Sequence, residues 1–475
     1  MQRVRPWLLV VPVALGLGIA GWLWLNRGQA SANWPELKPA AAALKPARIK
    51  LGPNVHVSSA TAAAEHMGCA LATDPTNPRR LFVASTLGDG YDDIVGYNSD
   101  DGGATWNFAG KRPHRPDEQV ADEEVAFGPD GGLFFVNMRV PRSSPGRHRY
   151  GTVGAGYIDL AYSSDGGKTW EERASIARYI DRPCLAVDGS NSSSRGRLYV
   201  HANVEEPVLI TSADAGKTFS NSVPMEPTVR STRPSNPVVL ADGAVLVTSA
   251  VFVTGADGHL ELPLWRSAGG GHSFRLVSAN LAGRWNHPRI KSSSVFDVFY
   301  PRLAADLGSP KFSGRVYCVW RDGHGLDESY ILFATSYDDG ATWSVPGILS
   351  EQPAGADAGP DYGTDIPAIA VNQQGVVAVS WYDRRGLPKH VVGLGGVIPS
   401  VPGYNARIRV SLDGGKTWTP SLQMNATPIK GNLEDARYWT GLAAAADGRF
   451  HAAWIGDATG KRQVWATAIE VGPTE

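Results

Sequence analysis

The stretch Ser99-Asp100-Asp101-Gly102-Gly103-Ala104-Thr105-Trp106 decides the fold of this chain, because its pattern Ser-x-Asp-x-Gly-x-Thr-Trp is repeated along the sequence. Each copy follows a short apolar run, such as Ile331-Leu332-Phe333-Ala334 before the fifth copy. The copies are therefore predicted to be hairpin turns at the ends of strands. The other five copies are residues 163–170, 212–219, 267–274, 336–343 and 411–418, of which only residues 267–274 lack the aspartate and have Gly269 instead.

The residue types of the repeat are those that a tight turn requires. An aspartate carboxylate accepts backbone N–H bonds, a glycine tolerates positive φ, and serine and threonine hydroxyls bond locally. The terminal Trp or Phe buries a large apolar surface against a neighbouring sheet. Turn chemistry accounts for every position, so it is favoured over a metal- or ligand-binding role for the repeat itself.

These repeats are Asp boxes, and the chain resembles the sialidase-like β-propeller superfamily, also called BNR-repeat proteins. The boxes extend from residue 99 to residue 418. The resemblance implies an all-β fold in which four-stranded antiparallel blades form a ring. It is specific for the fold and says little about any one activity.

A second motif, an apolar strand followed by a Gly-containing turn and another strand, predicts the number of blades. Seven copies favour seven blades, and six is the alternative because enzymatically characterised sialidases have six. The segment Val55-His56-Val57 is expected to supply the missing outer strand of the last blade and close the ring. The seven copies are residues 69–85, 124–137, 182–201, 233–247, 302–320, 366–381 and 438–454.

The N-terminus is typical of an exported protein. Residues 6–25 are apolar and uncharged, with Arg3 and Arg5 before them and Arg27 after them. Residues 1–27 are therefore predicted to be a signal anchor with a transmembrane helix, and the rest of the chain is predicted to be extracytoplasmic. Cleavage after Ala32 would instead give a secreted protein. Residues 28–51 are interpreted as an Ala/Pro-rich tether and residues 52–475 as the propeller.

Composition excludes several function classes. The net charge of −1 gives no basic surplus for nucleic acid. Cys69, Cys184 and Cys318 lie far apart, which is neither a disulfide framework nor a metal-ligand spacing. We therefore expect no metal and no cofactor. The resemblance to sialidases implies an acidic sugar or other glycan as the partner.

A ligand site is expected where the first strand of each blade begins and the second strand ends, near the axis and away from the boxes. Four of the seven first strands begin at or beside an arginine, which suits recognition of a carboxylate. Salt bridges between blades, with Asp181, Asp322, Asp383 and Asp435, are the structural alternative. The four arginines are Arg182, Arg233, Arg302 and Arg437.

Resemblance to sialidases implies roles for some of these residues. Sialidases hold the substrate carboxylate with three arginines and use a tyrosine nucleophile and an Asp acid/base. Arg233 and Arg302 match the arginine positions in part, and Tyr438 resembles the nucleophile. The first-blade Phe/Tyr-Arg-Ile-Pro motif is missing, and Arg182 is the candidate for a shifted position. The acid/base candidates are Asp93 with its neighbour Asp92, Asp365 and Asp383, although a structural salt bridge is favoured for Asp383.

Three functions are compatible with these sequence features. The first is a glycosidase of the exo-sialidase type, acting on a carboxylate-bearing sugar. The second is a non-catalytic propeller that binds a glycan or a protein. The third is a polysaccharide lyase acting on uronates, with His66, His201 or His324 as the base.

Overall fold

The computed structural model describes the propeller and leaves the first residues undescribed. The predicted membrane segment, residues 6–25, lies outside the described residues. Within the described part, no helix is long and apolar enough to cross a membrane. The described residues are 38–42, 48–88, 92–142, 156–177, 181–204, 206–220, 223–225, 233–253, 259–267, 270–278, 281, 301–324, 328–351, 364–385, 403–430 and 440–472.

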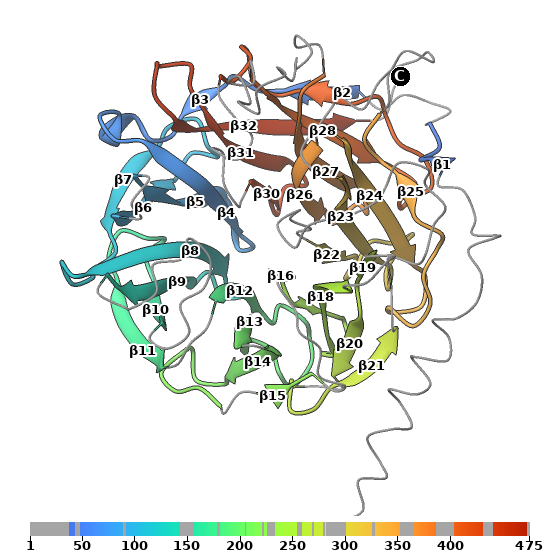
Figure 1. Cartoon of the computed structure of the whole chain (residues 1–475), viewed down its shortest axis with the longest axis horizontal. Helices are drawn as coiled ribbons and strands as arrows, with labels where there is room; N and C mark the ends of the chain where they lie inside the picture. The colour runs from blue at the N-terminus through green and yellow to red at the C-terminus, as the bar shows by residue number, and fades with distance from the viewer. Residues whose placement is uncertain are drawn as a thin grey trace, which may run out of the picture. The chain divides into compact units, whose positions relative to one another are not determined.

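Seven sheets of mainly antiparallel strands make up the unit of residues 38–283 and 289–475, and they are arranged as blades around a ring (Figure 1). The prediction of seven four-stranded blades is confirmed, and the alternative of six is wrong. Blade 1 contains β4 (His66–Asp74), β5 (Asn77–Leu87), β6 (Asp93–Ser99) and β7 (Asn107–Lys111); blade 2 contains β8 (Glu118–Phe127), β9 (Leu133–Pro141), β10 (Tyr157–Ser163) and β11 (Glu171–Ala177); blade 3 contains β12 (Asp181–Val187), β13 (Leu198–Val204), β14 (Glu206–Ser212) and β15 (Val223–Pro224).

The remaining four blades follow the same order along the chain. Blade 4 contains β16 (Arg233–Pro234), β17 (Val238–Val239), β18 (Val245–Val253), β19 (His259–Glu261), β20 (Leu264–Ser267) and β21 (Arg275–Ser278); blade 5 contains β22 (Arg302–Ala305), β23 (Val316–His324), β24 (Glu328–Ser336) and β25 (Gly347–Ile348); blade 6 contains β26 (Thr364–Val371), β27 (Val377–Asp383), β28 (Asn405–Ser411) and β29 (Leu422–Gln423); blade 7 contains β30 (Gly441–Ala444), β31 (Phe450–Gly456) and β32 (Gln463–Gly472). First strands of neighbouring blades contact one another, as β4 does β8, so they form the inner wall of the ring.

The outer strand of blade 7 comes from the N-terminal part of the chain. β2 (Arg48–Leu51) pairs antiparallel with β32, and β3 (Val55–His56) continues along the same strand. The Val55-His56 pairing was expected, whereas Arg48–Leu51 was assigned to the tether. In Arg48-Ile49-Lys50-Leu51 the two apolar residues alternate with the charged ones and pack against the core, which makes the segment a good outer strand.

The N-terminal segment also covers the outer edges of blades 5 and 6. β1 (Lys38–Pro39) pairs in parallel with β25, and the Ala40 N–H donates to the Ile348 carbonyl at 2.8 Å. Ala42 bridges to Trp418 of blade 6, whose N–H donates to the Ala41 carbonyl at 2.9 Å. We call residues 38–42 and 48–56 the N-terminal strap. Its hydrogen bonds cover strand edges that would otherwise be unpaired.

The boxes form the predicted turns, with the same hydrogen bonds in five of them. In each, the Ser hydroxyl donates to the Asp carboxylate at 2.8 Å, and the Thr hydroxyl donates to the other carboxylate oxygen at 2.6–2.7 Å. The Thr218 hydroxyl hydrogen bond is the main cause that lowers the pKa of Asp214 to about 2. Every carboxylate is thus used within its own turn, and among the described residues no group of three or more His, Cys, Asp or Glu is arranged to hold a metal ion.

The box tryptophans pack against the preceding blade, as predicted. Trp170 of blade 2 lies 5.3 Å from the Phe82 ring of blade 1, and Trp418 of blade 6 lies 4.8 Å from the Phe333 ring of blade 5, both edge-on. Such contacts make each box a link between two sheets as well as a turn within one.

Four inner strands, β4, β8, β12 and β26, carry the same bulge. In each, two residues face one on the partner strand, and the first of the two has a positive φ. Those residues are Gly68 (64°), Asp122 (54°), Arg182 (59°) and Ile366 (52°). Positive φ is strained for the last three, and for a β-branched residue such as Ile366 most of all. A bulge re-aims side chains, so these inner strands turn their backbone in the same way beside the ring centre.

Candidate functional site

The candidate site lies on the inner wall, where an ion pair joins two blades that are not neighbours. Arg302 begins β22 of blade 5, and its Nη1 atom lies 3.1 Å from Oε1 of Glu124 in β8 of blade 2. The two side chains are 14% and 15% exposed. Because β8 and β22 line opposite sides of the ring, the pair spans its centre (Figure 1).

Two further charged residues of the inner wall belong to the same region. The Cys184 thiol in β12 is buried, and burial raises its pKa to about 12, with the charges of Arg302, Glu124, Asp122 and Arg182 acting on it. Asp122 and Arg182 are the residues at the bulges of β8 and β12 and are themselves buried. The charges of two arginines and two carboxylates from three blades thus act on one thiol. We call Asp122, Glu124, Arg182 and Arg302 the axial cluster.

Adjacent glutamates of β8 have different partners. Glu123 accepts from the N–H and the hydroxyl of Thr86 in blade 1, at 3.2 and 2.6 Å, and burial raises its pKa to about 8. Glu124 instead faces the ring centre. Burial raises its pKa too, against the opposing effect of Arg302. Glu124 is therefore a carboxyl that keeps its proton to a higher pH than usual and lies beside an arginine.

Sequence reasoning gave no role to Glu124. The signal available was the run Asp122-Glu123-Glu124 inside a strand whose other inner positions are apolar. Three acidic residues in a buried first strand are costly unless paired, which points to a site. That run does not reveal which carboxyl faces the ring centre, because the bulge at Asp122 changes the alternation of side chains.

The four predicted arginines have different outcomes. Arg302 and Arg182 both belong to the axial cluster. Arg233 lies in β16, but its side chain is outside the described residues. Arg437 and the predicted nucleophile Tyr438 lie outside the described residues altogether.

Asp93 has partners away from the ring centre. It begins β6, the third strand of blade 1, and pairs with Lys111 at 2.6 Å and with His114 at 3.0 Å. Burial acts to raise its pKa, but hydrogen bonds from these two residues leave the pKa below its usual value. A carboxylate so strongly held in its charged form is a poor proton donor. The side chain of Asp365, in β26, lies outside the described residues.

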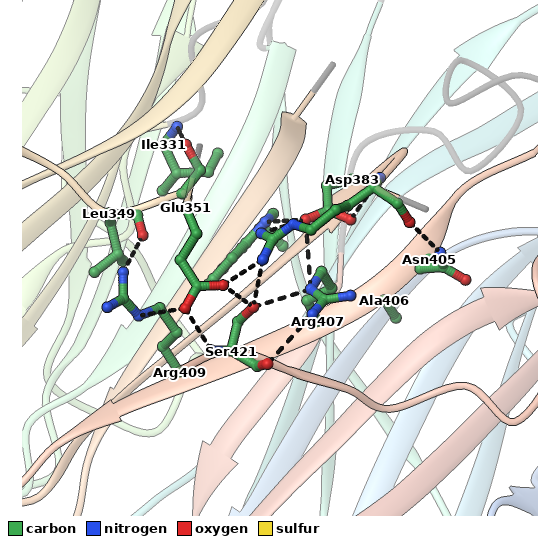
Figure 2. Close-up of polar contacts among 12 residues, drawn as sticks. Ile331, Leu349, Glu351, Asp383, Asn405, Ala406, Arg407, Arg409 and Ser421 are labelled. Carbon is green, nitrogen blue, oxygen red and sulfur yellow. Dashed lines mark hydrogen bonds and ion pairs between the residues drawn. The ribbon is translucent and has the colours of Figure 1, made fainter. Parts of the chain in front are cut away.

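Asp383 lies in a buried ion cluster between blades 5 and 6 (Figure 2). Its Oδ2 atom is 3.0 Å from Nη2 of Arg385 and 3.5 Å from Nε of Arg407, and it accepts from Trp381 Nε1 at 3.3 Å. Arg385 also bonds to Glu351, which accepts from the Ser421 hydroxyl at 2.6 Å. Arg385 links Asp383 of blade 6 to Glu351 of blade 5, so Asp383 belongs to an ion cluster that joins the two blades, which is the structural role favoured for it.

The histidines considered as lyase bases are core residues where the structure describes them. His66 bonds to Thr61 at 2.9 Å and Ser85 at 3.1 Å, and burial lowers its pKa to about 3. His201 bonds to the Ser235 carbonyl at 2.8 Å, and burial lowers its pKa to about 4. The side chain of His324 lies outside the described residues. Neither His66 nor His201 is open to a substrate, since both are fully buried.

Comparisons with known proteins agree with this architecture. A family model described as BNR/Asp-box repeat matches residues 161–172. A protein of unknown function from Dyadobacter fermentans has a TM-score of 0.51 and 14% identity, covering 89% of this chain and 99% of its own. An ulvan lyase has a TM-score of 0.48 and 10% identity (87% and 95% covered), and the Hadza microbial sialidase Hz136 has 0.43 and 14% (86% and 66% covered). No curated protein matches the chain in sequence.

The chain is a seven-bladed β-propeller, and the BNR/Asp-box repeat that the sequence predicted is matched by the family model at residues 161–172. At 14% identity the likeness to the Dyadobacter protein concerns the fold alone, and a fold by itself does not give an activity. The function therefore has to be argued from the axial cluster.

Proposed function

We propose that this propeller is a glycoside hydrolase of the exo-sialidase type, which cleaves a carboxylate-bearing sugar at the ring centre. The observation that carries the proposal is the 3.1 Å pair of Arg302 and Glu124 on the inner wall. Hydrolysis of an acidic sugar needs a cation that holds the substrate carboxylate and a carboxyl that supplies a proton. Both are present in one place.

The roles follow from the chemistry of the pair. Without substrate, Glu124 is the counter-ion of Arg302. A substrate carboxylate replaces it on the guanidinium, with Arg182 as the second cation of the cluster. Glu124, whose pKa burial raises, then takes up a proton from solvent and gives this proton to the leaving oxygen. Tyr438 is the nucleophile that resemblance assigns, and this assignment stays a prediction.

A non-catalytic glycan-binding propeller is the second candidate, and one observation favours it. Glu124 already neutralises Arg302, and a pair of this kind also serves to hold blades 2 and 5 in place. The uronate lyase finds no support in His66 or His201, because both are buried and neutral.

Glycan binding by an exported protein agrees with the N-terminal sequence. The proposal places the propeller outside the cytoplasm, held by residues 6–25 or released by cleavage after Ala32. This part rests on the sequence alone, namely on the apolar run and the arginines at positions 3, 5 and 27.

The test is product release by the purified full chain from a fluorogenic sialoside and a fluorogenic glucuronide. Wild type is expected to hydrolyse one of them. Glu124→Gln is expected to lower kcat about a hundredfold, because the amide has no proton to give. Arg302→Lys is expected mainly to raise KM, because a bidentate contact is lost. The control is Glu470→Gln, which removes an exposed carboxylate that pairs with Lys50 in blade 7.

Each outcome separates the candidates. Hydrolysis that falls in Glu124→Gln and stays unchanged in Glu470→Gln supports the enzyme. Binding of sialylated or uronate glycans without any hydrolysis supports the non-catalytic propeller. A product with a new carbon–carbon double bond, seen by ultraviolet absorbance, would replace hydrolysis by elimination.

A further inference from the structure

Blades 1 and 2 enclose a groove along their outer strands, far from the axial cluster along each sheet. It consists of two adjoining cavities of about 210 and 380 Å³, which share Pro113 and Glu172 as walls. The smaller cavity extends between β7 and β11, and the larger one follows β11 to Ser175. We call the two cavities together the inter-blade groove.

Aromatic rings form the inner end of the groove. Phe82, Phe135 and Trp170 line the smaller cavity, and their ring centroids lie 5.3–6.0 Å from one another. Gly96 is part of the same wall, and a Cβ atom there would lie 2.4 Å from the Phe82 ring. The glycine at position 96 therefore leaves the space that the Phe82 ring occupies. Phe82 and Phe135 are buried and support the half-buried Trp170, which is the ring of the three that can pack against the C–H face of a ring-shaped ligand.

The outer end of the groove is polar but nearly balanced in charge. Arg112 donates to both oxygens of Glu172, at 2.6 and 3.1 Å. Arg139 lies between Glu118 at 3.2 Å and Asp159 at 2.8 Å. The Ser175 hydroxyl donates to Asp159 at 2.8 Å. Each of these cations has its own carboxylate, so the groove offers many donors and acceptors without a surplus of either charge.

This combination selects the chemical class of a ligand. A simple anion would meet Glu172 and Asp159, and a simple cation would meet Arg112 and Arg139. A hydroxyl group both donates and accepts, so a polyol can bond to paired charges of both signs. The C–H face of a cyclic polyol also packs against an apolar wall. Neutral sugar rings have both properties.

We propose that the inter-blade groove binds a neutral saccharide of one or two rings. The ring stacks in the aromatic end beside Trp170, and the hydroxyl groups bond to Glu172 and Ser175 at the polar end. The site is separate from the axial cluster, so it holds whether or not the axial cluster is catalytic. On a polysaccharide that carries both neutral and acidic sugars, it would keep the propeller on the polymer.

The test is direct binding of lactose, cellobiose and maltose to the full chain, measured by saturation-transfer NMR and by quenching of tryptophan fluorescence. The full chain carries the predicted membrane segment and is therefore kept in detergent. This detergent must have no sugar headgroup, because such a headgroup would compete with the disaccharides. We expect saturable millimolar binding of at least one disaccharide by wild type. Glu172→Gln and Ser175→Ala are each expected to weaken it, the former about tenfold, since a hydrogen bond to a charged acceptor is lost. Glu172 is 51% exposed but pairs with the buried Arg112, so thermal unfolding of Glu172→Gln is recorded first, and Ser175→Ala tests the site without removing a charge.

The matched control is Glu470→Gln, because Glu470 is also a salt-bridged glutamate and is 54% exposed. Unchanged binding in this variant, together with weaker binding in Glu172→Gln, supports the proposal. The proposal is overturned if wild type binds none of the three disaccharides, or if binding is the same in wild type, Glu172→Gln and Ser175→Ala. Loss of hydrolysis at the axial cluster would not affect either result, so the two proposals fail separately.

Discussion

The Nη1 atom of Arg302 lies 3.1 Å from the Oε1 atom of Glu124, so one ion pair joins the inner strands of blades 5 and 2. Removing one partner leaves a largely buried charge. We expect Arg302→Met or Glu124→Gln to lower the free energy of unfolding by about 3 kcal/mol, and the double variant to lower it by less than the sum. Chemical denaturation of the four proteins measures this coupling. Additive losses would show that the pair does not act as a unit.

The first Asp box contains a matched pair of aspartates. Asp101 accepts from Ser99, from the Thr105 N–H and from the Thr105 hydroxyl, whereas Asp100 pairs with Lys168 on the surface. Asp101→Asn is expected to destabilise the protein by about 1 to 2 kcal/mol, because an amide cannot accept all of these bonds. Asp100→Asn is expected to change stability little. Thermal unfolding of both variants compares them, and equal effects would remove the turn argument.

Buried histidines predict a loss of stability in acid. Burial lowers the pKa of His201 from 6.5 to about 4. Between these values the unfolded chain binds a proton that the folded protein does not, so stability falls as the pH falls from 6.5 towards 4, by about 1.4 kcal/mol per pH unit for this group. Glu123, whose pKa is raised to about 8, has the opposite slope between 4.5 and 8.

The contribution of one histidine is isolated by a variant. His201→Asn keeps a side-chain donor and removes the titrating ring. Its cost in packing is independent of pH, so it is expected to be less stable at pH 7 but to lose stability less steeply below 6.5. Urea denaturation at several pH values gives both slopes. Parallel curves for the variant and wild type would mean that His201 is not neutral in the folded protein.

The N-terminal strap predicts a stepwise effect of truncation. A chain that begins at Arg48 lacks β1 and the Ala42 bridge but keeps β2, whereas a chain that begins at Gly52 also lacks the outer strand of blade 7. The first is expected to melt a few degrees below a chain that begins at Asn33. The second is expected to be much less stable, because β32 then has an open edge. Calorimetry of the three chains decides this, and equal melting temperatures would contradict it.

Asp383 is expected to matter for stability and not for chemistry. Asp383→Asn leaves Arg385 and Arg407 without their shared countercharge in a buried place. A loss of about 3 kcal/mol in unfolding free energy is expected. Any glycosidase activity of the folded variant should stay near that of wild type, measured well below its melting temperature. A large loss of kcat with unchanged stability would return Asp383 to the acid/base candidates.

The sequence alone determined the architecture of the propeller. The repeated Asp box fixes where each third strand ends, since its Ser, Asp, Gly and Thr side chains form the turn by local bonds that need no distant partner. Local chemistry of this kind is readable from one segment. The aromatic contact of Trp170 with the preceding blade follows from the same repeat, and the seven blades follow from the seven copies of the second motif, the pair of strands joined by a Gly-containing turn.

Only the tertiary structure decided which charged residues meet. Glu124 and Arg302 are 178 residues apart, and they pair because a closed ring places blades 2 and 5 opposite each other. The bulges at Asp122 and Arg182 shift the alternation of side chains, so a regular strand pattern misassigns what faces the centre. Asp383 lies beside arginines of its own blade, and one of these, Arg385, bonds to Glu351 of the preceding blade. Which charged residues pair over a long sequence separation depends on ring closure and on local backbone strain. Neither of these can be predicted from a single stretch of sequence.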